Sequence, residues 1–403
     1  MLFSIRIKPM NTPYYNINES KLMADIHLLK NSLHSFWGDN YICGYSVKTN
    51  SLPWLLNYLR KQDFYAEVVS AEEYDLSLRL GYDPSKVIYN GPIKDKDIFF
   101  NVINSKGIVN LDSHDELLWL EEKSYSLNFP AKIGLRVNCD LGAMCPEEKL
   151  AGDGIGRFGY SYENGTLKKV IDFINHLPNV KIVGLHMHAS TKTRSVKAFR
   201  TLAKMAGMIS EEYDLNLEYI DMGGGYLGGI PDKPNYKNYF EGICEELRAY
   251  FNPSDLTLIA EPGVSLISSA TTFVTSVLDT KEIGDTVFVV TDGSRMNLNP
   301  QVTRHTYPHH LERTQSSDHL LPSQWICGAT CMEYDRLFEL KDVPALKVGD
   351  RIVYDRAGGY TMCLTPLFIH YFPAVYIEKQ DGTIFTARKP WGNDEYLMNH
   401  YLE

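Results

Sequence analysis

The feature that most constrains the fold is a regular alternation of amphipathic helical segments and short apolar segments between residues 18 and 265. The first amphipathic helix is predicted over 19–33, where leucine and isoleucine recur at helical spacing. The apolar segments predict buried strands at 41–47, 67–69, 87–89, 108–111, 133–137, 182–188, 219–222 and 256–259. Roughly eight strand–helix units over ~250 residues is the size of a (β/α)8 barrel, which we favour over a doubly wound sheet.

The sequence pattern changes near residue 266. Runs of β-branched and aromatic residues, separated by turns, occupy 272–278, 286–291, 351–354 and 374–377. They predict an antiparallel β-barrel or sandwich domain, and the N-terminal strands, including alternating residues 1–8, would complete its sheet. The predicted α/β architecture is therefore N-terminal strands at 1–17, a TIM-like barrel at 18–265 and a C-terminal β domain at 266–403.

Composition excludes several classes of function. The net charge is −10 and no lysine–arginine cluster occurs, which argues against nucleic-acid binding. No apolar run approaches the ~20 residues that a membrane span needs. The seven cysteines include no C-x-x-C pair, and the N-terminus lacks the pattern of a secretion signal. We therefore expect reduced thiols in a soluble cytoplasmic protein.

Chemistry in a barrel gathers where the strands end, and Lys48 stands at such an end. It follows the apolar stretch 41–47 at the start of a loop. Partial desolvation there would favour the neutral amine, a nucleophile that can condense with an aldehyde. A lone lysine of this kind is more often an ordinary surface residue.

Two further strand ends carry glycine or acidic residues. Gly223, Gly224 and Gly225 let backbone N–H groups wrap a phosphate, or they form only a tight turn. Glu261 could pair with a pyridinium nitrogen, or cap a turn. In the later β region, Cys331 is by default expected to be a buried structural thiol. Tyr360 follows paired glycines that would let the backbone approach a ligand.

His186 and His188 are two residues apart and so share one face of a strand. Two such histidines could bind a metal, which makes a metal-dependent barrel hydrolase a rival hypothesis. No HExxH motif and no acidic or cysteine partner at ligand spacing supports it, and we expect no metal site. One histidine could instead lie flat against an aromatic cofactor, with His186 a satisfied core residue.

Taken in order, these segments resemble the fold type III pyridoxal-phosphate decarboxylases, the group containing diaminopimelate, ornithine and arginine decarboxylases. The resemblance covers essentially the whole chain. It rests on the segments Ser46–Asn50, Val69–Glu73, Gly184–His188, Asp221–Gly225, Glu261–Gly263, Gly328–Cys331 and Gly358–Tyr360.

The resemblance implies an alanine racemase/ornithine decarboxylase-like fold, the cofactor pyridoxal 5′-phosphate, and a homodimer with active sites at the subunit interface. Lys48 and Glu261 would come from one subunit, and Cys331 and Tyr360 from its neighbour. Lys48 and Cys331 would be catalytic, Cys331 protonating the carbon that loses its carboxylate. The implied cofactor-binding residues are Lys48, Glu67, Arg136, His188, Ser190, Thr191, Gly223, Gly224, Gly225, Glu261 and Tyr360. The implied substrate-binding residues are Tyr307, Met332, Glu333 and Tyr360.

Departures from the family pattern bear on the substrate. Val264 stands where the family usually has arginine, and Met332 and Pro308 stand where it usually has acids. Methionine and proline cannot pair with a distal ammonium. A modified, acidic, or carrier- or peptide-linked amino acid of siderophore, polyamine or peptide-antibiotic biosynthesis is therefore favoured over ornithine, lysine or free diaminopimelate. Glu333 or Asp335 could still supply the missing charge.

Three other functions stay open. They are diaminopimelate decarboxylase proper, an amino-acid racemase or epimerase on the same cofactor, and a non-catalytic homologue that acts as a binding partner. A racemase needs a second acid–base group on the opposite ring face, whereas the chain resembles the decarboxylases through both domains.

Overall fold

The computed structural model describes residues 10–127, 129–148, 155–315 and 319–401. The chain forms two compact units, a barrel unit of residues 24–266 and a β unit that combines the N-terminal segment up to Met23 with the chain from Ile267 onward. The predicted strand over residues 1–8 lies outside the described residues.

The barrel unit is a closed ring of parallel strands. Its strands are β2 (Tyr41–Ser46), β3 (Tyr65–Val68), β4 (Val87–Tyr89), β5 (Ile108–Leu111), β6 (Ala131–Asn138), β8 (Val180–His186), β9 (Tyr219–Asp221) and β10 (Thr257–Ala260). The ring closes because β10 pairs with β2 and β5 pairs with β6, while the short β7 (Tyr160–Ser161) pairs only with β6. This closure confirms the predicted (β/α)8 barrel and excludes the doubly wound sheet.

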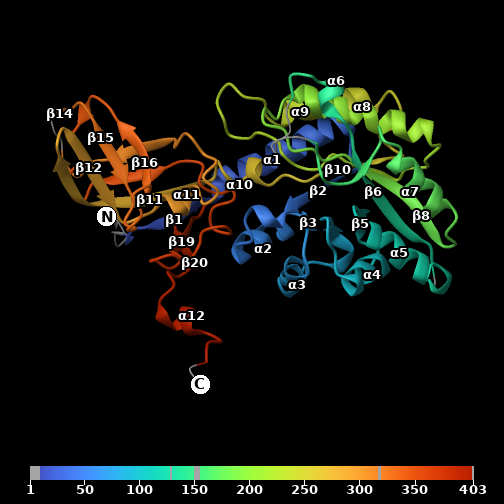
Figure 1. Cartoon of the computed structure of the whole chain (residues 1–403), viewed down its shortest axis with the longest axis horizontal. Helices are drawn as coiled ribbons and strands as arrows, with labels where there is room; N and C mark the ends of the chain where they lie inside the picture. The colour runs from blue at the N-terminus through green and yellow to red at the C-terminus, as the bar shows by residue number, and fades with distance from the viewer. Residues whose placement is uncertain (1–9, 128, 149–154, 316–318, 402–403) are drawn as a thin grey trace. The chain divides into compact units, whose positions relative to one another are not determined.

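Helices follow the strands. The longer ones are α1 (Glu19–Trp37), α2 (Pro53–Lys61), α3 (Ala71–Arg79), α4 (Lys96–Asn104), α5 (His114–Lys123), α7 (Thr166–Asn175), α8 (Val196–Glu212) and α9 (Tyr236–Leu247), and short ones are α6 (Leu141–Met144) and α10 (Val264–Ile267). Figure 1 shows α3, α4 and α5 on the outside of their strands. The start of α3 is fixed because Ser70 Oγ accepts from the Glu73 N–H and the Glu73 carboxylate accepts from the Val69 N–H.

The barrel interior is apolar near the start of its strands. Ile88, Val183, Tyr219 and Ile259 form a buried cluster against which Ile42, Tyr65 and Ile108 pack. The polar residues predicted from the sequence follow the strands at their carboxyl ends. Since all eight strands are parallel, those ends meet at one rim.

The β unit holds a nine-stranded sheet that includes a strand from before the barrel. Its strands are β1 (Tyr14–Asn18), β11 (Thr271–Ile283), β12 (Thr286–Thr291), β13 (His309–Glu312), β15 (Gln324–Cys327), β16 (Arg336–Leu340), β18 (Arg351–Tyr354), β19 (Ala374–Glu378) and β20 (Ile384–Arg388). The pair β14 (Leu320–Leu321) and β17 (Val343–Pro344) stands apart, and the short helices are α11 (Arg295–Leu298) and α12 (Asn393–Leu397).

The prediction of a purely antiparallel domain is wrong for two pairings. β1 runs parallel to β19, and β12 runs parallel to β15. Parallel neighbours need long connections, and both pairs have them, since the whole barrel separates β1 from β19. Among the described residues, no helix has the length and apolar character of a membrane span.

Candidate active site

Lys48 lies just beyond β2, in a 3-10 turn over Val47–Thr49. Its Nζ lies 2.6 Å from Oε2 of Glu67, and Ser46 Oγ donates to the same oxygen at 2.6 Å. The Lys48 side chain is 40% exposed whereas that of Glu67 is 1% exposed. Lys48 is thus less desolvated than its sequence neighbourhood predicts, because the turn leaves the amine at the rim beside a buried carboxylate.

Asn90 joins this ion pair to Glu261. It follows β4, and its Nδ2 donates to Glu67 Oε1 at 3.2 Å and to Glu261 Oε1 at 2.6 Å. Both carboxylates are buried. The sequence analysis missed Asn90 as a site residue. The available signal was a polar side chain, followed by Gly91, directly after an apolar strand.

His186, Asp221 and Glu261 form a buried cluster below this rim. The Nε2 of His186 lies 3.5 Å from Glu261 Oε2, and neither ring nitrogen has a hydrogen-bond partner among the described residues. The expectation of a satisfied core histidine is therefore wrong for His186. One ligand atom from each of the three residues lies within 4.8 Å of the others, so an acidic partner for His186 exists that sequence spacing did not reveal.

The carboxylates of this cluster are already held by protein donors. Asp221 accepts from the Gly223 N–H at 2.8 Å and from Asn110 at 3.3 Å, and Glu261 accepts from Asn90. Burial raises the pKa of Asp221, and the neighbouring Glu261 carboxylate adds to the rise. Burial acts in the same direction on Glu261, but His186 and Asp221 outweigh it and hold the pKa of Glu261 low. These directions favour the ionised form of Glu261.

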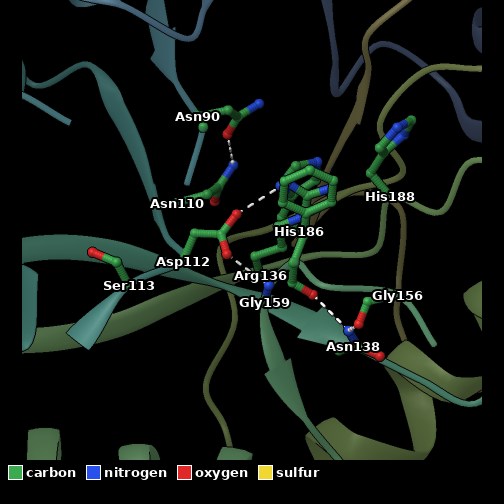
Figure 2. A network of polar contacts seen from close by, with 12 residues as sticks. Asn90, Asn110, Asp112, Ser113, Arg136, Asn138, Gly156, Gly159, His186 and His188 are labelled. Atoms are coloured by element: carbon green, nitrogen blue, oxygen red, sulfur yellow. Dashed lines mark hydrogen bonds and ion pairs between the residues drawn. The ribbon is translucent and has the colours of Figure 1, made fainter. Parts of the chain in front are cut away.

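His188 follows β8 and faces the glycine loop. Its Nδ1 lies 3.2 Å from the Gly224 nitrogen, which donates to it, and its Nε2 lies 3.4 Å from Ser190 Oγ. Burial lowers the pKa of His188 to about 3, and the charges of Arg136 and His186 add to the shift. The His188 ring, drawn in Figure 2, is therefore neutral and presents a flat aromatic surface.

The glycine loop needs its glycines. Gly223 and Gly225 have φ values of 64° and 96°, in the left-handed region. A side chain at Gly223 would overlap with His188, and one at Gly224 would overlap with the backbone of Glu261. The loop thus lies close against the histidine and the end of β10, with Gly223 and Gly224 buried and Gly225 half-buried.

Arg136 lies on β6, opposite His186 of β8 (Figure 2). Its Nη1 lies 3.0 Å from Oδ2 of Asp112, and the guanidinium lies 4.5 Å from the ring centre of Phe158. Its buried Nε has no hydrogen-bond partner in the described part of the chain. A cavity of about 270 Å³ is lined by Arg136, Phe158, His188 and Ser190, among others. Thr191, in contrast, is buried as a turn residue whose Oγ1 accepts from a backbone N–H.

Cys331 lies in the β unit and is exposed, so the default of a buried structural thiol is wrong. Its loop is built around Asp335, because the buried Asp335 carboxylate accepts from Thr330 Oγ1 at 2.6 Å and from the Arg295 N–H at 2.7 Å. Met332 is half-buried, and the exposed Glu333 lies 3.1 Å from Arg336.

Tyr307 and Tyr360 also belong to the β unit. The Tyr307 hydroxyl accepts from Asn299 at 3.0 Å, and its ring stacks on Phe338 with ring centres 6.1 Å apart. Tyr360 is half-buried with φ 55°. A side chain at Gly358 would overlap with the Ile267 carbonyl, so this glycine serves packing inside the β unit. The structure thus gathers the predicted barrel residues at one rim and leaves the ligand roles of the β-unit residues as predictions.

Comparisons with known proteins agree on the family. Residues 20–268 match the family model for the pyridoxal-binding domain of pyridoxal-dependent decarboxylases. The chain is 28% identical to a probable chloroplastic diaminopimelate decarboxylase of Oryza sativa subsp. japonica, covering 96% of this chain and 79% of that protein. It is 26% identical to the L-glutamyl-(BtrI acyl-carrier protein) decarboxylase of Niallia circulans, covering 87% and 86%. A diaminopimelate decarboxylase structure from M. jannaschii superposes with a TM-score of 0.85 at 22% identity, covering 98% and 93% of the chains.

The rim residues fit the cofactor of this family. The glycine loop keeps side chains away from a bound phosphate, and the buried Nε of Arg136, which has no hydrogen-bond partner among the described residues, offers it a donor. The ionised Glu261 suits a protonated ring nitrogen, and the neutral His188 suits an aromatic face. The chain therefore belongs to the pyridoxal-dependent decarboxylases, which are carboxy-lyases that use pyridoxal phosphate.

Proposed function

We propose that this enzyme removes the α-carboxylate of an amino-acid-type substrate whose distal end is not a free ammonium. The distal end would instead be modified, acidic, or linked to a carrier protein or peptide, as in specialised biosynthetic pathways. The observation that carries the proposal is the Cys331 loop. Met332 follows the cysteine, the Asp335 carboxylate is buried and used by Thr330 and Arg295, and Glu333 is paired with Arg336.

An ammonium buried beside Met332 without a partner would cost several kcal/mol, enough to exclude it from a productive complex. A relative that acts on a carrier-linked glutamyl group supports a substrate of this kind, since that group has no distal ammonium.

The roles of the barrel residues follow from their geometry. When bound, pyridoxal phosphate supplies an electron sink for the electrons left when carbon dioxide departs. We assign Lys48 to the cofactor aldehyde, with Glu67 beside it to hold its amine in place. Glu261 would hold a proton on the ring nitrogen, and His188 would lie against the ring. Arg136 and the glycine loop would hold the phosphate.

Cys331 is the proposed proton donor, at the carbon that has lost its carboxylate. Cys331 and Tyr360 would reach the site from the second subunit of a homodimer. Such an enzyme fits a cytoplasmic location, because all seven cysteines are free thiols.

Diaminopimelate decarboxylase proper is the second candidate, favoured by the likeness to the probable diaminopimelate decarboxylase of rice. Carbon dioxide release should be measured with free meso-diaminopimelate, lysine and ornithine, and with acylated and carrier-linked forms of the same amino acids. Our proposal expects turnover of a derivatised or acidic substrate and poor kcat/KM on the three free diamino acids. Efficient turnover of free diaminopimelate would overturn it in favour of the second candidate.

A further inference from the structure

A chain of buried hydrogen bonds leads from Glu261 into the middle of the barrel. Asn90 Oδ1 accepts from Asn110 Nδ2 at 2.9 Å, as Figure 2 shows. Asn110 Oδ1 in turn accepts from the Tyr219 hydroxyl at 2.8 Å. Asn110 and Tyr219 come from β5 and β9, and all these side chains are buried. Glu261 is thus connected through two asparagines to a phenol deep in the barrel.

In each of these hydrogen bonds, the donor and the acceptor are fixed by the neighbouring groups. Both N–H bonds of the Asn90 amide are used on Glu67 and Glu261, and both N–H bonds of the Asn110 amide are used on Asn90 and Asp221. Each asparagine therefore has only its carbonyl oxygen left to accept with. The Tyr219 hydroxyl ends the chain as a donor, because burial keeps it protonated by raising its pKa.

Two glycines make room for the phenol. A side chain at Gly134 on β6 would overlap with the Tyr219 hydroxyl and with Asn110 Oδ1. A side chain at Gly184 on β8 would overlap with the Tyr219 ring itself. These glycines do not have left-handed backbone angles, so space explains them better than conformation.

We propose that Tyr219 is a positioning residue for the cofactor. By donating to Asn110 it fixes the orientation of both asparagine amides, and so keeps two N–H donors on Glu67 and Glu261. Glu261 is thereby aimed at the cofactor ring nitrogen by the Asn90 amide. This inference rests on the role proposed above for Glu261. Without the phenol, the Asn110 amide loses its fixed orientation, and the pattern of donors around both glutamates is lost.

The test uses purified holoenzyme and the bound cofactor as its own probe. Tyr219→Phe removes one hydroxyl and keeps the ring, and Asn110→Leu breaks the same link from the other side if Tyr219→Phe does not fold. Tyr82→Phe is the matched control, since Tyr82 is another buried tyrosine of the barrel unit whose hydroxyl donates to the Leu56 carbonyl at 2.9 Å. Glu261→Gln is the reference variant.

Two quantities are measured, the pH midpoint of the cofactor's visible absorption change and the unfolding temperature. We expect Tyr219→Phe and Asn110→Leu to shift the spectral midpoint in the same direction as Glu261→Gln, by a smaller amount. Tyr82→Phe should lower the unfolding temperature and leave the midpoint unchanged. If Glu261→Gln shifts the midpoint but Tyr219→Phe and Asn110→Leu do not, the positioning role of Tyr219 is wrong while the role of Glu261 stands. If Glu261→Gln itself leaves the midpoint unchanged, the role of Glu261 fails and the inference with it.

Discussion

The ammonium of Lys48 lies 2.6 Å from the buried carboxylate of Glu67, so the lysine at the barrel rim has a fixed anionic partner. This ion pair makes two lysine variants informative. Lys48→Ala should abolish turnover, because no amine is left to bind the cofactor aldehyde. Lys48→Arg should be equally inactive, yet it keeps a cation beside Glu67 and so should unfold at a temperature closer to that of the wild type. Decarboxylation by either variant, measured as released carbon dioxide, would contradict the assignment of Lys48.

Glu261→Gln should retain the cofactor and lose most decarboxylation. A neutral amide cannot hold a proton on the ring nitrogen, so the ring becomes a poorer electron sink. The measurement is kcat for carbon dioxide release at saturating cofactor, with cofactor content determined by absorbance. Unchanged kcat would reduce Glu261 to a structural residue.

The low pKa of His188 predicts an acid-dependent loss of stability. The ordinary pKa of histidine is about 6.5, and burial lowers that of His188 to about 3. The unfolded chain therefore takes up this proton first as the pH falls. The stability that neutral His188 contributes is complete above about pH 6.5 and decreases as the pH falls toward 3.

Glu73 acts in the opposite direction, because burial raises its pKa to about 7 and its contribution is lost as the pH rises toward that value. The informative quantity is therefore the difference between wild type and His188→Phe, which keeps a flat ring without a titrating group. In denaturant unfolding of the cofactor-free protein, we expect the wild type to lose more stability than the variant between pH 7 and pH 5, with a slope of up to about 1.4 kcal/mol per pH unit. Equal losses would show that His188 is protonated as easily in the folded chain as in the unfolded one.

The proposed homodimer with shared sites predicts complementation between two inactive variants. Lys48→Ala and Cys331→Ala subunits, mixed under conditions that exchange subunits, should recover about one quarter of the wild-type sites, since only one site of each heterodimer has both groups. Activity per subunit is the measurement, and each variant alone is the control. A mixture that forms heterodimers and stays inactive would exclude shared sites.

Met332 should control the choice of substrate. Met332→Glu places a carboxylate where a distal ammonium would otherwise be unpaired, and should raise kcat/KM on at least one of lysine, ornithine and diaminopimelate while impairing the native reaction. Met332→Gln is the control, because it has similar size and polarity without the charge. If both variants respond alike to the free diamino acids, the charge at this position is not what selects the substrate.

Sequence periodicity was enough to predict the barrel, because each strand–helix unit is encoded locally. The strand ends also gave Lys48, His188 and Glu261 as residues that would share one rim. What could not be predicted is how side chains from different strands meet inside the ring. Asn90 and Asn110 appear in the sequence only as polar residues in or after short apolar strands. Their partners come from β9 and from the end of β10, more than 100 residues away.

The same limit applies in the β unit. Asp335 appeared able to supply a charge to the substrate, but it is buried because the loop from Gly328 to Thr330 folds around its carboxylate. The two parallel pairings of the sheet were missed because β-branched runs indicate strands without indicating their direction.

The pairing of β1 with β11 and β19 has a consequence for how this chain is made. The barrel unit is one continuous stretch, residues 24–266, and can close while later residues are still being synthesised. β1 is synthesised before the barrel unit, but its sheet neighbours β11 and β19 are synthesised after it, and β19 begins only at Ala374. β11 can pair with one edge of β1 once residues 271–283 are made, but the other edge stays unpaired until nearly the whole chain has been synthesised, so newly made chains are most exposed to mispairing at their first strand.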